Sequence, residues 1–329
     1  MGMARAGALT ACRAFSSLSA ARGVASLSAA LQERVTPAVG TALAREGYAV
    51  VDGLFGKNAL RLRDELFALR PFMAPNATHL VRNGQTVTLQ KHGILEVEAH
   101  NLSAEGVALA PTLHALSRDR TLLTLLAVYC RESLQYQTLK VQLNAGDGAC
   151  FPLHTDSDVE LDSRRLTCLF YLNEHWKAGD GGELVLYPFP RRRVVVEPLF
   201  DRCVLFSATQ LLHRVLPSAV QRACFTVWLF ARQGVLPQLK QPQLRIEPQP
   251  ATLQGFMDSG PSLRKHIVKA VYRDEWAQSI QQSHPDTAAR DAALQALHGD
   301  VAAIERVLAA RFTGAQQLLT ELRKEHATP

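Results

Sequence analysis

Several features that would place this chain in a membrane, disulfide-rich or nucleic-acid-binding class are missing from its sequence. No apolar run reaches the length of about 18 residues that a membrane-spanning helix needs. The six cysteines show no Cys-x-x-Cys pair or framework spacing, which predicts reduced, mostly buried thiols. The formal net charge of +6 is not accompanied by an RNA- or DNA-binding motif, so we expect no nucleic-acid partner.

Acidic residues are absent from the first 32 residues, and the first one is Glu33. This stretch carries Arg5, Arg13 and Arg22 and is rich in Ala and Ser, a composition typical of mitochondrial or plastid transit peptides. We therefore expect residues 1–32 to be a targeting segment or a disordered tail. Mitochondrial import is the favoured interpretation, with a cytoplasmic or plastid location as the alternative, and the folded part is expected to start near Glu33.

The remaining chain has the composition of a globular protein, with 47% hydrophobic and 20% charged residues. Residues 33–133 form a region in which apolar positions recur at helical spacing. The pattern predicts helices over 39–46, 57–69 and 111–128, a strand over 48–51, and a β-hairpin over 85–97 that turns near His92-Gly93.

The character of the sequence changes over residues 134–233. Short runs rich in Val, Leu, Phe, Tyr and Thr alternate with Gly, Asp, Asn and Pro, which predicts an all-β sandwich or barrel. The runs that we interpret as strands are 139–144, 150–156, 164–173, 181–188, 192–199, 202–208 and 224–230.

A Pro- and Gln-rich linker over residues 234–255 precedes a helical C-terminal extension over 256–329. Apolar residues recur there at spacings of three or four, which indicates an amphipathic helix. Its apolar stripe either packs onto the same chain, the favoured interpretation, or forms a homo-oligomer contact; the residues are Leu297, Val301, Ile304, Leu308 and Phe312.

Candidate metal ligands lie in the β region. His154 and Asp156 end a candidate strand, and residues two apart point to the same face of a strand. A third ligand must come from elsewhere in the sheet; His213 is the favoured candidate and His175 the alternative. Two histidines and one carboxylate form the facial triad of non-haem Fe(II) oxygenases, whereas structural zinc has four protein ligands.

Arg222 lies nine positions after His213, at the start of the next candidate strand. An oxygenase that binds a dicarboxylate needs a buried cation for the carboxylate far from the metal. Arginine suits this role because its planar guanidinium pairs with a carboxylate through two hydrogen bonds and remains charged. In isolation, the same residue would be interpreted as a solvated charge at a strand end.

Residues 136–231 resemble the prolyl 4-hydroxylase family of 2-oxoglutarate oxygenases, and in particular the hypoxia-inducible-factor type of prolyl hydroxylase. The resemblance implies an α+β protein whose core is a double-stranded β-helix, a jelly-roll barrel like that of the cupins, with supporting N-terminal helices. The motifs follow the family's order at near-family spacing; they are His154–Asp156, Arg164–Asn173, Gly181–Pro188, Glu197–Arg202, His213–Pro217 and Arg222–Phe230.

By this resemblance His154, Asp156 and His213 hold Fe(II), and Arg222 pairs with the distal carboxylate of 2-oxoglutarate. Tyr171 is expected to donate a hydrogen bond to that same carboxylate. Further positions implied by the resemblance line the cosubstrate slot (Thr167, Thr226 and Trp228) and the substrate entrance (Arg164).

The resemblance also implies the reaction. O2 and 2-oxoglutarate are converted to succinate and CO2 while a prolyl residue of a peptide or protein is hydroxylated, and ascorbate keeps the iron reduced. Asn144 and Phe151 stand where the hypoxia-type group has tyrosines, which leaves two alternatives open. One is a 2-oxoglutarate oxygenase that acts on another side chain or a small molecule, and the other is a non-catalytic metal-binding interaction module.

Overall fold

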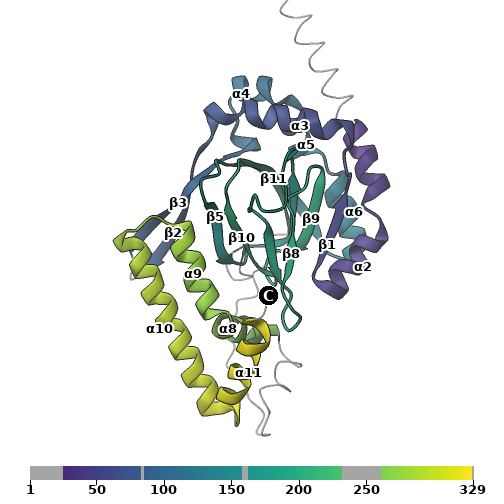
Figure 1. Cartoon of the computed structure of the whole chain (residues 1–329). Coiled ribbons are helices and arrows are strands. Elements are labelled where there is room, and N and C mark those ends of the chain that lie inside the picture. Colours follow the sequence, from purple (N-terminus) through teal and green to yellow (C-terminus); the bar gives the residue numbers. More distant parts are fainter. Residues whose placement is uncertain (1–24, 83–84, 158–161, 232–260, 328–329) are drawn as a thin grey trace, which may run out of the picture.

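The centre of the molecule is a pair of antiparallel sheets, seen in a computed structural model that describes residues 25–82, 85–157, 162–231 and 261–327 (Figure 1). The seven-stranded sheet has the order β1-β9-β6-β11-β4-β3-β2, and the four-stranded sheet has the order β5-β10-β7-β8. The strands are β1 (Tyr48–Asp52), β2 (Ala74–Arg82), β3 (Gln85–Glu98), β4 (Leu134–Asn144), β5 (Ala149–His154), β6 (Arg164–Tyr171), β7 (Leu184–Tyr187), β8 (Val194–Val196), β9 (Arg202–Ser207), β10 (Leu212–Ser218) and β11 (Arg222–Ala231).

Side chains from both sheets meet between them, so the strands enclose a common interior. A buried cluster there combines Leu169 and Phe206 of the seven-stranded sheet with Leu186 and Val215 of the four-stranded sheet. This arrangement is the double-stranded β-helix that the resemblance implied, it fits the sandwich or barrel that the strand pattern predicted, and the α+β class is confirmed.

Side chains of β11 alternate between two environments, the hydrophobic core beneath the N-terminal helices and the interior of the barrel. Ala223, Phe225, Val227 and Leu229 belong to the large hydrophobic cluster between the seven-stranded sheet and the N-terminal helices. Successive side chains of a strand point to opposite faces. The intervening positions, which include the polar and aromatic residues predicted for the site, therefore face the barrel interior; they are Arg222, Cys224, Thr226 and Trp228.

Helices of the N-terminal region cover the outer face of the seven-stranded sheet (Figure 1). They are α2 (Pro37–Glu46), α3 (Lys57–Ala68), α4 (Ala104–Leu109), α5 (Pro111–Arg118) and α6 (Thr121–Cys130), with 3-10 turns over Arg70–Phe72 and Ala99–Asn101. The region also contributes β1, β2 and β3 to the sheet, and β1 is the strand that the sequence predicted over 48–51.

The folded part starts earlier than the expected position near Glu33. Residues 25–34 are helical, and Leu27 and Leu31 are 0% and 1% exposed within the same hydrophobic cluster. Leu27, Leu31 and Val35 recur every four residues and so form one face of a helix. The short apolar face was not predicted because the Ala- and Ser-rich composition around it is typical of a targeting segment.

Two further expectations for the N-terminal region were wrong. The single helix predicted over 111–128 is two helices, because Asp119 is extended and its side chain accepts a hydrogen bond from the backbone N–H of Thr121. The hairpin predicted over 85–97 is one long strand, β3, which pairs with β2. The turn signal at His92-Gly93 marks an irregularity in that pairing, where Gly93 has a φ of +64°.

The C-terminal helices cover the outer face of the four-stranded sheet (Figure 1). They are α8 (Pro261–Val271), α9 (Arg273–Ser283), α10 (Ala288–Arg311) and α11 (Ala315–Ala327). The predicted apolar stripe packs within the chain, where Leu297, Val301 and Leu308 are at most 4% exposed. The linker predicted over 234–255 lies outside the described residues.

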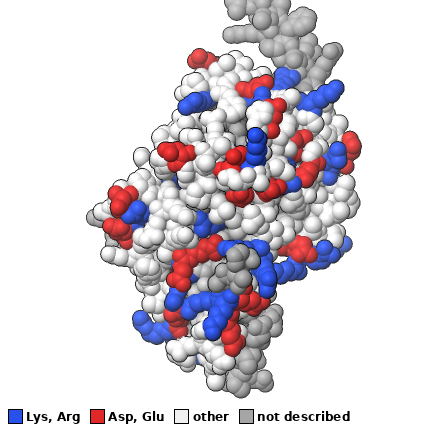
Figure 2. All heavy atoms as spheres, viewed as in Figure 1, with Lys and Arg blue, Asp and Glu red and all other residues white. Residues whose placement is uncertain are grey.

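Other sequence expectations concern surface and redox chemistry. The cysteines within the described residues, which exclude Cys12, are free thiols. None of the helices in the described ranges combines the length and hydropathy that crossing a membrane requires. Basic and acidic side chains are interspersed over much of the face shown in Figure 2.

Candidate active site

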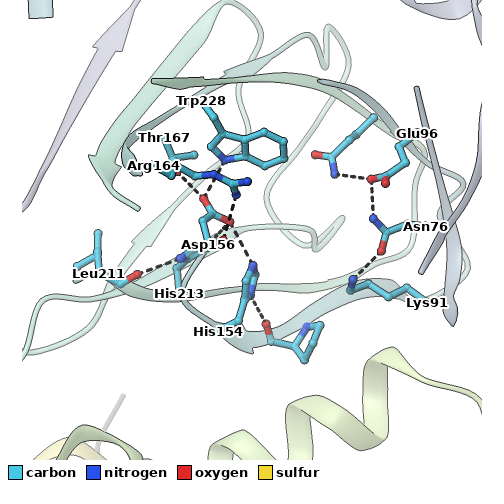
Figure 3. Close-up of polar contacts among 12 residues, drawn as sticks. Asn76, Lys91, Glu96, His154, Asp156, Arg164, Thr167, Leu211, His213 and Trp228 are labelled. Atoms are coloured by element: carbon cyan, nitrogen blue, oxygen red, sulfur yellow. Dashed lines mark hydrogen bonds and ion pairs between the residues drawn. The ribbon is translucent and has the colours of Figure 1, made fainter. Parts of the chain in front are cut away.

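The three predicted metal ligands converge at one end of the barrel interior (Figure 3). His154 ends β5, and His213 lies directly opposite it on the paired strand β10. Asp156 follows β5, and its Oδ1 lies 3.5 Å from Nε2 of His154 and 3.6 Å from Nε2 of His213. One ligand atom from each residue falls within 4.8 Å of the others, a spacing that a single metal ion can bridge.

Backbone carbonyls orient both imidazole rings. Nδ1 of His154 donates to the carbonyl oxygen of Pro152 at 2.7 Å, and Nδ1 of His213 donates to that of Leu211 at 3.1 Å. Because a carbonyl only accepts, these contacts place the proton on Nδ1 and leave the Nε2 lone pair directed at the centre. Burial, aided by the neighbouring His213, lowers the pKa of His154 and favours the neutral ring that a metal requires.

The Asp156 carboxylate is held by residues of the opposite sheet. Thr167 on β6 donates to its Oδ2 at 2.5 Å, and the indole Nε1 of Trp228 on β11 donates to the same oxygen at 3.3 Å. Burial alone would raise the pKa of Asp156, but His213 and His154 hold that pKa well below its usual range. The carboxylate is therefore ionised, with Oδ2 bonded to the barrel wall and Oδ1 directed at the histidines.

Arg164 contacts the backbone of Asp156. Its Nη1 donates to the backbone carbonyl of Asp156 at 3.0 Å, and its guanidinium lies 4.2 Å from the centroid of the Trp228 ring. The Lys140 ammonium lies 5.0 Å from the same ring. Both cations hold the Trp228 ring in place by cation–π contacts. The predicted slot residue Trp228 and the predicted entrance residue Arg164 therefore contact each other on one wall of the site.

Arg222 and Tyr171 form a second polar centre inside the barrel. Arg222 is 2% exposed and its guanidinium lies 4.8 Å from the Tyr171 ring. Among the described residues, neither Nε nor Nη2 of Arg222 nor the Tyr171 hydroxyl has a hydrogen-bond partner. Burial raises the pKa of Tyr171 to about 12, so its hydroxyl remains a donor. A buried cation and a hydroxyl without partners form a site for an anion such as a carboxylate.

Local sequence makes room for that arginine. Gly182 has a φ of +79°, and a Cβ there would lie 3.1 Å from Cδ of Arg222. A side chain at this position would be strained and would crowd the guanidinium. Thr226, predicted for the cosubstrate slot, is 4% exposed on the inward face of β11 between Arg222 and Trp228.

The structure excludes the alternative third ligand and explains a departure from the family pattern. His175 is 88% exposed at its side chain and is not part of the cluster.

Asn144 is buried, donates to the carbonyl of Ala149 and accepts from the N–H of Gly146, so it stabilises the turn into β5. Phe151 lies beside the site, with its ring centroid 6.5 Å from that of His154.

Sequence reasoning missed a polar network beside the metal centre (Figure 3). Asn76 on β2 donates to Glu96 on β3 at 2.5 Å and accepts from Lys91 at the same distance. Lys140 and Gln142 on β4 also donate to Glu96, at 3.0 and 3.3 Å. The alternation of polar Lys140, Gln142 and Asn144 with apolar residues along β4 was the available signal for an inward polar face.

A profile of the 2OG-Fe(II) oxygenase superfamily matches residues 137–230, a span that contains the triad, Tyr171 and Arg222. The solved structure of a prolyl 4-hydroxylase from Phytophthora capsici is 30% identical to the chain and superimposes with a TM-score of 0.70. That similarity covers 90% of this chain and 94% of the oomycete protein.

Curated relatives match over shorter stretches. Prolyl hydroxylase EGLN3 of Mus musculus is 35% identical over 119 residues, which is 33% of this chain and 49% of the mouse protein. Egl nine homolog 1 of Homo sapiens is 36% identical over 88 residues, 26% of this chain and 20% of the human protein. The match thus spans about half the length of the mouse relative and less of the human one.

Proposed function

The chain belongs to the 2OG-Fe(II) oxygenase superfamily, and we propose that it hydroxylates prolyl residues of a peptide or protein, with 2-oxoglutarate and O2 as cosubstrates. One observation carries the proposal. A His-Asp-His cluster occupies the interior of the barrel, together with a buried arginine that has two nitrogens without a partner among the described residues. The first suits a metal with open coordination positions, and the second suits the far carboxylate of a dicarboxylate.

The donor set fits Fe(II). Two neutral imidazoles and one ionised carboxylate provide nitrogen and oxygen ligands on one side of the metal and leave further positions available. Bound there with 2-oxoglutarate, Fe(II) would activate O2 so that one oxygen atom enters a substrate C–H bond while the other leaves in succinate, with CO2 released. We also propose ascorbate as the reductant that maintains Fe(II).

The chain's own residues would bind and orient the reactants. His154, Asp156 and His213 hold the metal, with Thr167 and Trp228 fixing the direction of the carboxylate. Arg222 and the Tyr171 hydroxyl hold the distal carboxylate of 2-oxoglutarate and so keep its ketoacid end toward the metal. Holding 2-oxoglutarate and the metal in a fixed geometry lowers the entropic cost of bringing the reactants together.

The prolyl substrate is supported by the relatives named prolyl hydroxylase or prolyl 4-hydroxylase. The alternative substrates are a different side chain and a small molecule. They remain open because the residues beside the site, namely the polar network around Glu96 and the phenylalanine at position 151, could select a substrate other than proline. A purely structural metal-binding module is disfavoured because such a module has no use for a buried anion pocket around Arg222.

The decisive experiment uses protein loaded with Fe(II) in the absence of oxygen, then exposed to air with 2-oxoglutarate and a library of proline-containing peptides. We expect succinate formation and a mass gain of one oxygen atom on proline. His154→Ala should abolish both, whereas His175→Ala, a change at an exposed histidine, should leave both intact. Oxygen on another residue would identify the alternative substrate, and failure to bind both metal and 2-oxoglutarate would refute the assignment.

We further propose that the N-terminal segment directs the protein to mitochondria. Since Leu27 and Leu31 pack into the core, the targeting information should reside in residues 1–24. Fused to a fluorescent reporter, residues 1–24 should give mitochondrial localisation, and Arg→Gln changes at positions 5, 13 and 22 should abolish it. A reporter distributed throughout the cytoplasm would contradict this proposal.

Self-association through the C-terminal helices also remains a proposal. The apolar stripe of α10 is largely buried within the chain, but Val307 on the same helix is 49% exposed. Light scattering of wild type and Val307→Asp should show a change from dimer to monomer. A monomeric wild type would refute self-association.

A further inference from the structure

One helix of the C-terminal extension, α9, contacts both strands that carry the metal-binding histidines. In Figure 1 α9 lies beside β5 and β10. The residues next to the histidines belong to the hydrophobic cluster formed with the C-terminal helices. Leu153 and Leu212 are 2% and 3% exposed in a cluster that also contains residues of α8, α10 and α11. The histidines themselves point the opposite way, into the barrel.

The first contact is to β5. The backbone N–H of Leu153 donates to Oγ of Ser279 at 2.9 Å, and the Ser279 hydroxyl in turn donates to the carbonyl of Trp276 at 2.7 Å. Ser279 is 0% exposed. Among the strands that the structure describes, β5 is at the edge of its sheet, so one side of it lacks a neighbouring strand to accept backbone hydrogen bonds. Ser279 supplies that acceptor at the residue directly before His154.

The second contact is to β10. Arg214, directly after His213, is 3% exposed and donates through Nη2 to Oε1 of Gln282. Its Nη1 lies 3.7 Å from Oε1 of Glu275, which also accepts from the Tyr187 hydroxyl. Residues 275, 279 and 282 follow the spacing i, i+4, i+7 and therefore share one face of α9.

We propose that α9 is a positioning element of the metal centre. Ser279 acts on His154 through the backbone of Leu153, and Glu275 with Gln282 act on His213 through Arg214. A single rigid helix thus sets the separation and orientation of two ligands that come from different strands. Groups that hydrogen-bond directly to a ligand change metal affinity by about 10- to 100-fold when they are removed, and because α9 acts one residue further from the ligands we expect the lower end of this range.

The test measures metal binding by the full-length chain, independently of turnover. Titration of the metal-free protein with Co(II) under anaerobic conditions reports affinity, and the visible absorption of Co(II) reports the geometry of its ligands. Ser279→Ala should raise the dissociation constant about tenfold and alter the spectrum. Ser283→Ala is the matched control, because that buried hydroxyl bonds within α9 and to His284.

Glu275→Gln provides a second, independent variant if Ser279→Ala does not fold. It keeps the shape of the side chain but removes the charge that faces both Arg214 and Arg193, and we expect weaker Co(II) binding with an altered spectrum. Unfolding of the metal-free proteins by urea shows how much stability each variant loses. Wild-type Co(II) affinity and spectrum in the position-275 and position-279 variants, whatever their stability, would overturn the inference.

The inference rests on the metal site of the proposed function, and the same titration separates the two failures. If wild type itself binds neither Co(II) nor Fe(II), the proposed metal centre is wrong. If wild type binds metal and the α9 variants bind it equally well, only the positioning role of α9 is wrong.

Discussion

Thr167 donates its hydroxyl to Oδ2 of Asp156 across 2.5 Å, from the sheet opposite the strand that leads to this aspartate. The contact links the two sheets at the metal centre. It adds a contact to the role that the family resemblance implied for this residue, which is to line the cosubstrate slot. In the structure Thr167 directly holds the carboxylate that faces the metal.

The first prediction concerns this hydroxyl. Thr167→Val keeps the shape of the side chain but removes the donor, and we expect Fe(II) affinity to fall about tenfold because Asp156 is no longer oriented. Thr167→Ser keeps the donor and should remain within about twofold of wild type. Calorimetric titration with Fe(II) or Mn(II) under anaerobic conditions measures both, and equal affinities for the Val and Ser variants would contradict the role.

The second prediction concerns the anion pocket. Arg222→Met should raise the dissociation constant for 2-oxoglutarate by about 100-fold, or about 2.7 kcal/mol, because the distal carboxylate loses its buried partner. Arg222→Lys keeps the charge but loses the planar pair of donors, so an intermediate value is expected. Fluorescence or calorimetric titration in the presence of Mn(II) gives these constants.

The same substitution has an opposite effect on the protein without ligand. Arg222 is a buried cation whose Nε and Nη2 have no partner among the described residues, which is an unfavourable arrangement until an anion binds. The metal-free Met variant should therefore unfold at an equal or higher temperature than wild type, and 2-oxoglutarate should stabilise only wild type. A large loss of stability in the ligand-free variant would show that Arg222 is structural.

The parts of the site that were predictable from sequence are those set by local periodicity. His154 and Asp156 are two residues apart at a strand end, and Arg222 begins an alternating strand, so their common direction follows from β geometry. Local periodicity predicted the pairing of His154 with Asp156, whereas the choice of His213 over His175 and the anion-binding role of Arg222 depended on the family resemblance. The short alternating strands predicted a sandwich or barrel, and the α+β class followed from the resemblance and from the helical periodicity on either side of those strands.

The parts that were missed depend on register and on distant segments. Whether Thr167 faces Asp156 depends on how the two sheets pack against each other, which no local pattern specifies. Ser279 lies 126 positions from its partner Leu153 in the chain, so only the folded arrangement reveals their contact. Gly93 shows the related ambiguity that a glycine signals either a turn or a strand irregularity.

The third prediction tests where the folded part begins. Leu31 is 1% exposed in the core beside the N-terminal helices, and Leu31→Ala should lower the free energy of unfolding by about 2–5 kcal/mol. Leu60→Ala, at a leucine that is 41% exposed on α3, is the control and should change it by less than about 0.5 kcal/mol. Urea unfolding measures both, and an unaffected Leu31 variant would place that segment outside the fold.

The fourth prediction follows from Lys91 in the network beside the metal centre. Burial lowers the pKa of Lys91 to about 8, against the opposing attraction of Glu96. The unfolded chain, with an ordinary lysine pKa of about 10.4, therefore binds more protons than the folded chain between the two values. Protonation of Lys91 favours the unfolded chain, so the free energy of unfolding should rise with pH across that window. Below pH 8 the folded protein carries the full cost of burying the charged ammonium.

Removing the ionisable group should remove that slope. Between pH 7 and 9.5 wild type should gain on the order of 2 kcal/mol relative to Lys91→Met, from the linkage of protonation to folding. Lys57→Met, at an exposed lysine at the start of α3, controls for general charge effects and should follow wild type. Urea unfolding at each pH measures the difference. If the wild-type and Lys91→Met curves stay parallel, the Lys91 ammonium is as well solvated in the folded protein as in the unfolded chain.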